Sequence, residues 1–162
     1  MAVKEQTRHE LDLSLEICAP PAVVFQSFFE EGALAAWQGI RRAIAVPRLL
    51  GPYVLDWVPS EDADEVLGRR GGVLRATVMH VEPNDHVFLA DVFWLPPDTG
   101  PIGPLAIQAT FKATLSNSGT SATLLRVAIT GFDEDVRSQR YHAIATAHWQ
   151  RALRILKLLL EK

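Results

Sequence analysis

The chain has 162 residues, 48% of them apolar, which is long enough for one domain with its own core and too short for two. We therefore expect a single domain over residues 1–162. Its net charge of -3, without any run of lysine or arginine, argues against a nucleic-acid partner, because binding the phosphate backbone needs concentrated positive charge.

Membrane association is not expected either. Residues 1–10 contain no apolar signal-peptide core, and the apolar tail over residues 155–160 is far shorter than the roughly 20 residues that span a bilayer. A single cysteine, Cys18, fits a reducing compartment, and we interpret it as a small core residue. Together these features predict a cytoplasmic protein.

The first predicted element is a strand over residues 11–17, where leucine and isoleucine alternate with polar residues. Pro20 and Pro21 end it. A short helix is expected there, because a proline at the first helical position loses no hydrogen bond. A second short helix is expected after Gly32 and carries Trp37.

The middle of the chain is predicted to form about six strands separated by turn residues. They are expected at residues 44–49, 53–58, 73–82, 87–94, 105–115 and 123–130. Their short connections require antiparallel neighbours.

Two loops interrupt this rhythm. The acidic loop over residues 60–65 is predicted to be solvated. The loop over residues 96–104 contains four prolines, and we interpret it as a stiff rim over a cavity mouth. An inert crossover and a dimer contact are the alternatives for this second loop.

The last predicted element is a long helix over residues 133–162, which contain no glycine or proline. One stripe of this helix is small or aromatic in its first half and aliphatic in its second. The first half is interpreted as a pocket wall and the second as a core plug. Laying the helix across a curved antiparallel sheet would bury this stripe and leave a cavity between the two. This predicts an α+β fold.

These features, in this order, resemble the activator-of-Hsp90-ATPase-like branch of the START/Bet v 1-like (SRPBCC) superfamily. The resemblance rests on residues 11–25, on Trp37, on residues 78–89 and on residues 149–156, and it covers nearly the whole chain. It implies a helix-grip fold, with a seven-stranded curved antiparallel sheet around a long C-terminal helix and two short helices after the first strand. It also implies a hydrophobic cavity and no shared catalytic motif.

Strand alternation indicates which side chains face this cavity. It turns Asp56, Arg75 and Lys112 toward water and their neighbours inward. The same logic at Asp91 would turn Phe88, Ala90, Val92 and Trp94 inward. The predicted ligand-binding residues are Trp37, Tyr53, Trp57, Val78, Phe88, Val92, Trp94, Phe111, Tyr141, Ala145, His148, Trp149 and Ala152. Aromatic walls of this kind suit a flat, mostly apolar molecule, and the alternative is that they only fill the core.

One histidine is the main candidate for chemistry in the cavity. His148 stands where members of the resembled family often have glycine, and it could bind a ligand or act as a general acid or base. The alternative is a partly buried histidine bonded to a backbone carbonyl. Beside it, His80 and Asp91 are the only ionisable residues expected to reach the cavity. His142 and His148 lie on different sides of the helix, so no metal site is expected.

The leading hypothesis is a protein that binds a hydrophobic or aromatic small molecule in this cavity, without a cofactor. The first alternative is a polyketide cyclase/aromatase-like or hydrolase-like enzyme that uses His148 with Asp91 or His80. The second is a chaperone-regulating interaction module, as the Hsp90 resemblance implies. No catalytic residue is assigned, and the formation of a homodimer is left as a possibility.

Overall fold

The computed structural model describes residues 10–162, and the expectation that no signal peptide begins the chain falls on residues outside this range. The elements in chain order are β1 (Leu11–Ile17), α1 (Pro21–Gln26), α2 (Glu31–Gln38), β2 (Arg42–Ala45), β3 (Pro52–Trp57), β4 (Ala63–Asp64), β5 (Gly68–Arg69), β6 (Gly72–Glu82), β7 (His86–Leu95), β8 (Ile102–Leu115), β9 (Ser121–Thr130) and α3 (Val136–Leu160).

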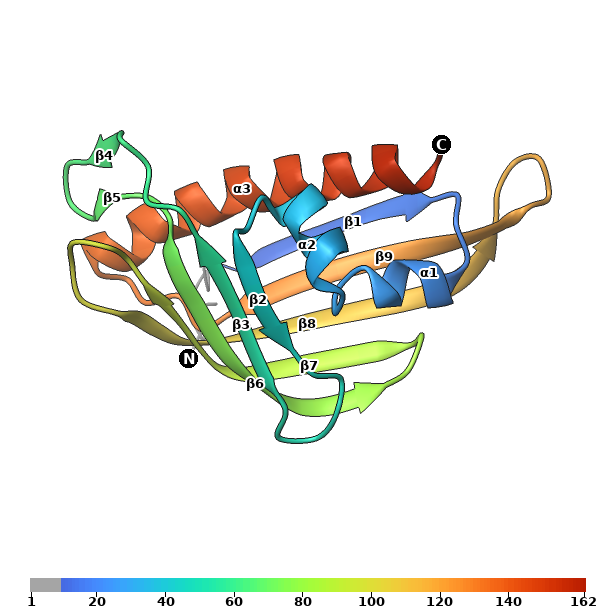
Figure 1. The fold of residues 1–162 in the computed structure, drawn as a ribbon, viewed down its shortest axis with the longest axis horizontal. Coiled ribbons are helices and arrows are strands. Elements are labelled where there is room, and N and C mark those ends of the chain that lie inside the picture. Colours follow the sequence, from blue (N-terminus) through green and yellow to red (C-terminus); the bar gives the residue numbers. More distant parts are fainter. Residues whose placement is uncertain (1–9) are drawn as a thin grey trace, which may run out of the picture.

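Seven of the strands form one antiparallel sheet in the order β1-β9-β8-β7-β6-β3-β2. The sheet curls, and α3 lies along it, while α1 and α2 cover its open side (Figure 1). A separate two-stranded hairpin, β4-β5, lies beside the first turns of α3 (Figure 1). The predicted α+β helix-grip arrangement is therefore confirmed. No helix of the described residues is long and apolar enough to cross a membrane.

Strand β1 shows how alternation places side chains. Leu11 and Ile17 are buried, whereas Asp12 and Glu16 face water, and the whole strand pairs with β9. The prediction that Cys18 is a core residue is wrong, because the same alternation turns it outward after Ile17 and leaves it exposed.

The two short helices begin and end as their residues favour. Pro21 occupies the first position of α1, and Gly39 ends α2 in a left-handed conformation with φ 75°. Trp37 is only 1% exposed, and its indole N–H donates to the carbonyl of Ser27 at 2.8 Å. Because α2 packs against α3 and β2, this contact fixes one end of the helix layer.

Helix α3 begins at a capped terminus and changes character along its length. The Asp135 carboxylate accepts from the Ser138 N–H at 2.9 Å, which satisfies a backbone donor of the first turn. Tyr141, Ala145 and Trp149 are buried one turn apart. Beyond them the buried side chains of α3 are small or aliphatic, namely Ala152, Leu153 and Leu156. They join the main core, as the pattern predicted for Leu153 and Leu156, whereas Ala152 was expected on the pocket wall.

Strand β7 departs from the predicted alternation because it contains a bulge. The register with β8 shifts around Asp91, whose φ is 50°. Val92 and Trp94, after the bulge, are buried as predicted. Phe88 and Ala90, before it, are partly exposed between buried neighbours. Their predicted inward orientation is wrong, because the bulge shifts which residues face inward.

The outward-facing residues also differ at one position. Arg75 and Lys112 are exposed as expected, but Asp56 is only 7% exposed. It lies beneath two arginines and accepts from Arg41 Nε at 3.1 Å and from Arg42 Nη2 at 3.0 Å. The hydrogen bond from Arg41, supported by that from Arg42, lowers the pKa of Asp56. The alternation predicted correctly which face of the sheet Asp56 is on, but it did not predict that two arginines would cover the carboxylate.

Candidate functional site

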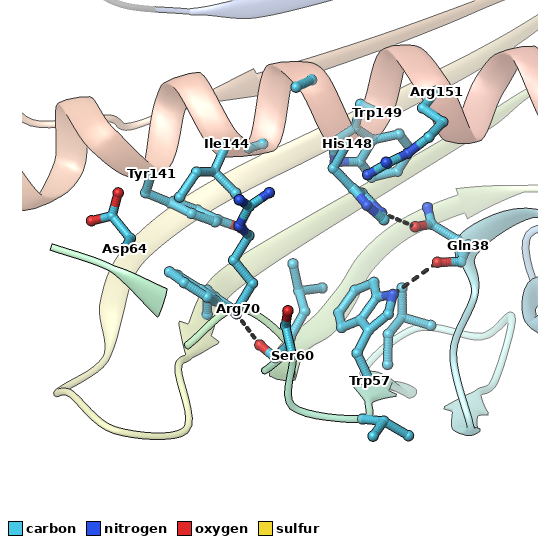
Figure 2. Close-up of a pocket in the computed structure, with 17 residues that line it drawn as sticks. Gln38, Trp57, Ser60, Asp64, Arg70, Tyr141, Ile144, His148, Trp149 and Arg151 are labelled. Carbon is cyan, nitrogen blue, oxygen red and sulfur yellow. Dashed lines mark hydrogen bonds between the residues drawn. The ribbon is translucent and has the colours of Figure 1, made fainter. Parts of the chain in front are cut away.

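A cavity of about 500 Å³ lies between α3 and the strands β3, β6 and β7. Its size falls in the range of about 300–1,000 Å³ that is typical of sites for small organic molecules. Figure 2 shows side chains from α3 on one side and from the strands and the 58–71 segment on the other. The lining residues are Gln38, Leu55, Trp57, Val58, Ser60, Asp64, Arg70, Gly71, Leu74, Trp94, Tyr141, Ile144, Ala145, Ala147, His148, Trp149 and Arg151.

The aromatic wall of the cavity is held by bonds to the backbone. Trp94 stacks on Tyr141 with ring centroids 4.6 Å apart, and its indole N–H donates to the carbonyl of Gly71 at 2.8 Å. The indole N–H of Trp57 donates to the carbonyl of Gln38, also at 2.8 Å. Both indole donors are therefore occupied, and these two rings offer a ligand mainly apolar surface.

The Tyr141 hydroxyl is the polar tip of this wall. Burial raises the pKa of Tyr141 well above its ordinary value, so the hydroxyl stays protonated at neutral pH. It makes no hydrogen bond with any other group of the described residues 10–162. A ligand would find here one hydroxyl that is free to donate or accept.

His148 is a neutral residue in this setting. Its Nε2 lies 2.6 Å from Gln38 Oε1, and its ring meets Trp57 edge to face at 5.5 Å. Burial, together with the nearby charge of Arg151, lowers the pKa of His148 from 6.5 to about 4. An amide oxygen can only accept, so Nε2 carries the proton and Nδ1 is left as an acceptor. The partner is a side-chain amide rather than the backbone carbonyl of the alternative interpretation.

The lowered pKa of His148 makes a testable prediction about stability. The unfolded chain binds the proton more strongly than the folded protein between pH 6.5 and about 4, so stability should fall as pH falls through this window. The paired aspartates, such as Asp56, have lowered pKa values and lose their contribution only below their ordinary value of 3.8. We expect the urea midpoint of His148→Gln to depend less on pH between 6.5 and about 4 than the midpoint of the wild type does. If the midpoint of the variant fell with pH as steeply as that of the wild type, the lowered pKa of His148 would be contradicted.

Gln38 links two walls of the cavity and leaves one group unsatisfied. Its backbone carbonyl accepts from the Trp57 indole N–H, and its side-chain oxygen accepts from His148 Nε2. Its Nε2 is buried and has no hydrogen-bond partner within residues 10–162. A buried amide donor without a partner costs about 1–3 kcal/mol, so an acceptor that entered beside it would be favoured.

The wall opposite α3 comes from a segment that the sequence led us to expect as a solvated loop. Asp64 pairs with Arg140 of α3 at 2.7 Å and also accepts from the N–H groups of Val66 and Leu67. The hydrogen bond from Arg140, with those from the backbone, holds the pKa of Asp64 well below its usual range. Leu67 is fully buried. The segment is thus tied to the helix, and the expectation of a solvated loop is wrong for Asp64.

The proline-rich loop over residues 96–104 supports this wall from behind. Asp98 pairs with Arg69 at 3.0 Å, and Thr99 Oγ1 donates to the carbonyl of Leu67 at 2.9 Å. Arg137 of α3 donates to the carbonyl of Gly100. None of residues 96–104 lines the cavity. The expected rim over the mouth is therefore formed by the 58–71 segment, which this loop braces.

The cavity includes six of the predicted ligand-binding residues: Trp57, Trp94, Tyr141, Ala145, His148 and Trp149. Tyr53 borders a second space of only about 20 Å³, and its hydroxyl donates to the carbonyl of Phe28 at 2.7 Å. Trp37, Val78, Val92, Phe111 and Ala152 are buried in the core and border neither space, and Phe88 faces outward.

The ionisable partners expected for His148 are elsewhere. His80 and Asp91 are exposed and do not line the cavity, and the His80 ring instead lies 5.1 Å from that of His86. The predicted pairing of His148 with His80 or Asp91 is therefore wrong. Within residues 10–162, no three histidine, cysteine, aspartate or glutamate side chains are grouped to hold a metal ion.

Sequence reasoning missed the polar residues of the cavity. Gln38, Ser60, Arg70 and Arg151 belong to loops or helix ends, or to a helical face next to the apolar stripe, and Asp64 belongs to the two-residue strand β4. A usable signal existed for Arg151, because it lies seven residues after Ile144 and three after His148 on one face of α3. Asp64 and Arg70 gave no comparable periodic signal.

The sheet, the gripped helix and the cavity between them define a START/Bet v 1-like, helix-grip fold. Neither a scan of protein families nor a search of curated proteins finds a match by sequence.

Solved structures of this fold do match. Protein Ms6760 from Mycobacterium smegmatis is 14% identical with a TM-score of 0.71, over 99% of this chain and 96% of that chain. The Aha1 dimer from Colwellia psychrerythraea is 16% identical with a TM-score of 0.61, over 94% and 96%. DynU16, from the dynemicin biosynthetic locus, is 18% identical with a TM-score of 0.60, over 95% of this chain and 48% of that chain. At these identities the similarity shows the fold alone.

Proposed function

We propose that this protein binds a hydrophobic or aromatic small molecule in the cavity beneath α3. The observation that carries this proposal is the cavity of about 500 Å³ whose walls hold Trp57, Trp94 and Tyr141 with the indole N–H groups already bonded. Apolar surface that a ligand buries there contributes about 25 cal/mol per Å² before the entropy losses of binding.

The polar groups around the cavity support binding more than catalysis. His148 has a lowered pKa and an amide partner, and Asp64, the one carboxylate among the lining residues, pairs with Arg140. These groups suit the orientation of a ligand.

The similarity to Aha1 and the sequence motifs support a place in the activator-of-Hsp90-ATPase-like branch. The single cysteine supports a cytoplasmic location.

A thermal-shift screen with aromatic small molecules tests the proposal. A ligand at 100 times its Kd should stabilise the folded protein by about 2.7 kcal/mol and so raise Tm. Compounds that raise Tm of the wild type should fail to do so for Trp57→Ala, which removes one wall of the cavity. The control is Phe93→Ala, because Phe93 packs under Arg75 outside the cavity. Equal shifts in both variants, or no shift with any compound, would contradict the proposal.

A further inference from the structure

The guanidinium groups of two arginines at the cavity have no partner within the described residues 10–162. Arg70, just before β6, and Arg151, on α3, both line the cavity and are both exposed. Neither guanidinium makes a hydrogen bond or ion pair within residues 10–162. Five of the other arginines are paired with aspartate, namely Arg41, Arg42, Arg69, Arg126 and Arg140.

The charge around the cavity is therefore positive, although the whole chain carries -3. Asp64 is the only carboxylate among the lining residues, and Arg140 and two backbone N–H groups already occupy its oxygens. No lining residue remains to neutralise Arg70 or Arg151. Fields of one sign within a cleft raise the local concentration of the opposite ion.

The two guanidinium groups lie over the same space. Figure 2 shows Arg70 extending from the strand side toward Ile144, and Arg151 folding back along α3 toward His148. Arg151 is near enough for its charge to act on the His148 ring. A planar guanidinium binds a carboxylate through two parallel N–H···O bonds, which makes arginine well suited to an acidic group.

We infer that the ligand is an aromatic or hydrophobic acid, whose anionic group lies against Arg70 and Arg151 while its apolar part covers Trp57, Trp94 and Tyr141. This inference rests on the proposed function, because it names the chemical class of the ligand for the same cavity. The neutral His148 and the protonated Tyr141 hydroxyl add no negative charge that would oppose such a ligand.

The test compares 2-naphthoate with its uncharged relative 2-naphthamide by isothermal titration calorimetry. The wild type should bind the carboxylate at least about tenfold more tightly, because a guanidinium forms two charge-assisted hydrogen bonds with a carboxylate and the amide offers only a neutral carbonyl oxygen. In the double variant Arg70→Gln/Arg151→Gln this preference should vanish, because the carboxylate loses more affinity than the amide does. Arg154→Gln is the matched control, because Arg154 is exposed on α3 one turn beyond Arg151 and lines no cavity.

The outcomes separate the two proposals. Equal affinities of the wild type for the two compounds, or a preference that survives in the double variant, would overturn the inference and leave the cavity as a neutral binding site. That result would mean that Arg70 and Arg151 are solvated surface residues. Failure of both compounds to bind would count against the proposed function itself, and the inference would fall with it. Added salt should weaken the binding of 2-naphthoate and leave the binding of 2-naphthamide unaffected.

Discussion

Ala145→Phe should abolish the binding of aromatic ligands while the protein stays folded. Ala145 is on α3 between Tyr141 and Trp149 and lines the cavity. A phenyl ring attached there would occupy the space that a ligand needs, and it would bury apolar surface against existing aromatic walls. Calorimetry with 2-naphthoate measures the loss of binding, and urea denaturation measures the stability, which should fall by less than the cost of overpacking a filled core, about 1–3 kcal/mol.

Ala152→Phe is the matched control for this prediction. Ala152 is also buried on α3, but it borders no cavity and belongs to the core. The same ring would there be forced into packed side chains, at a cost of about 1–3 kcal/mol or more. We expect stability to fall and ligand affinity to persist in the molecules that remain folded. The opposite pattern in the two variants would show that the space beside Ala145 is not the binding site.

Gly71→Ala should lower the free energy of unfolding by roughly 2–4 kcal/mol. Gly71 has a φ of 96°, which side chains rarely adopt, and an added Cβ would lie 2.5 Å from the carbonyl oxygen of Val58. Its own carbonyl holds the Trp94 indole. A shift of this backbone would therefore also displace one aromatic wall and weaken the binding of 2-naphthoate. Urea denaturation and calorimetry measure the two effects.

Gly32→Ala provides the comparison within the same protein. Gly32 is in α2, has no positive φ, and a Cβ there would meet nothing within 4 Å. Because alanine favours the helix over glycine, stability should be unchanged or raised by up to about 1 kcal/mol. Equal losses in the two variants would mean that the geometry at Gly71 is not what makes it sensitive.

Periodic elements of the fold could be predicted from the sequence because their burial repeats at a fixed interval. The alternation in β1 and the stripe of α3 are examples, and both elements begin and end within a few residues of the expected positions. Strand β2 ends earlier, at Ala45 instead of Leu49, since Pro47 has no N–H to continue the ladder. In β7 the bulge at Asp91 broke the alternation, and nothing in the pattern marked it.

The polar part of the cavity could not be predicted, because it depends on contacts between distant residues. Asp64 and Arg140 are separated by 76 positions, and the Gln38 amide meets His148 across 110. An aspartate in an acidic loop looks solvated until the helix that pairs with it is placed. The aromatic part could be predicted only partly. Strand and helix periods correctly placed four aromatic residues at the cavity, namely Trp57, Trp94, Tyr141 and Trp149. The same periods apply to Trp37 and Phe111, which are buried in the core instead.

The four tryptophans provide the most direct test of binding in the cavity. Trp57, Trp94 and Trp149 line it, whereas Trp37 is buried outside it with its N–H bonded to Ser27. Titration of 15N-labelled protein with 2-naphthoate should move the indole N–H signals of these three in the NMR spectrum, and the Trp37 signal should move least. Uniform small shifts, or movement of Trp37 alone, would contradict the proposal that the ligand binds beneath α3.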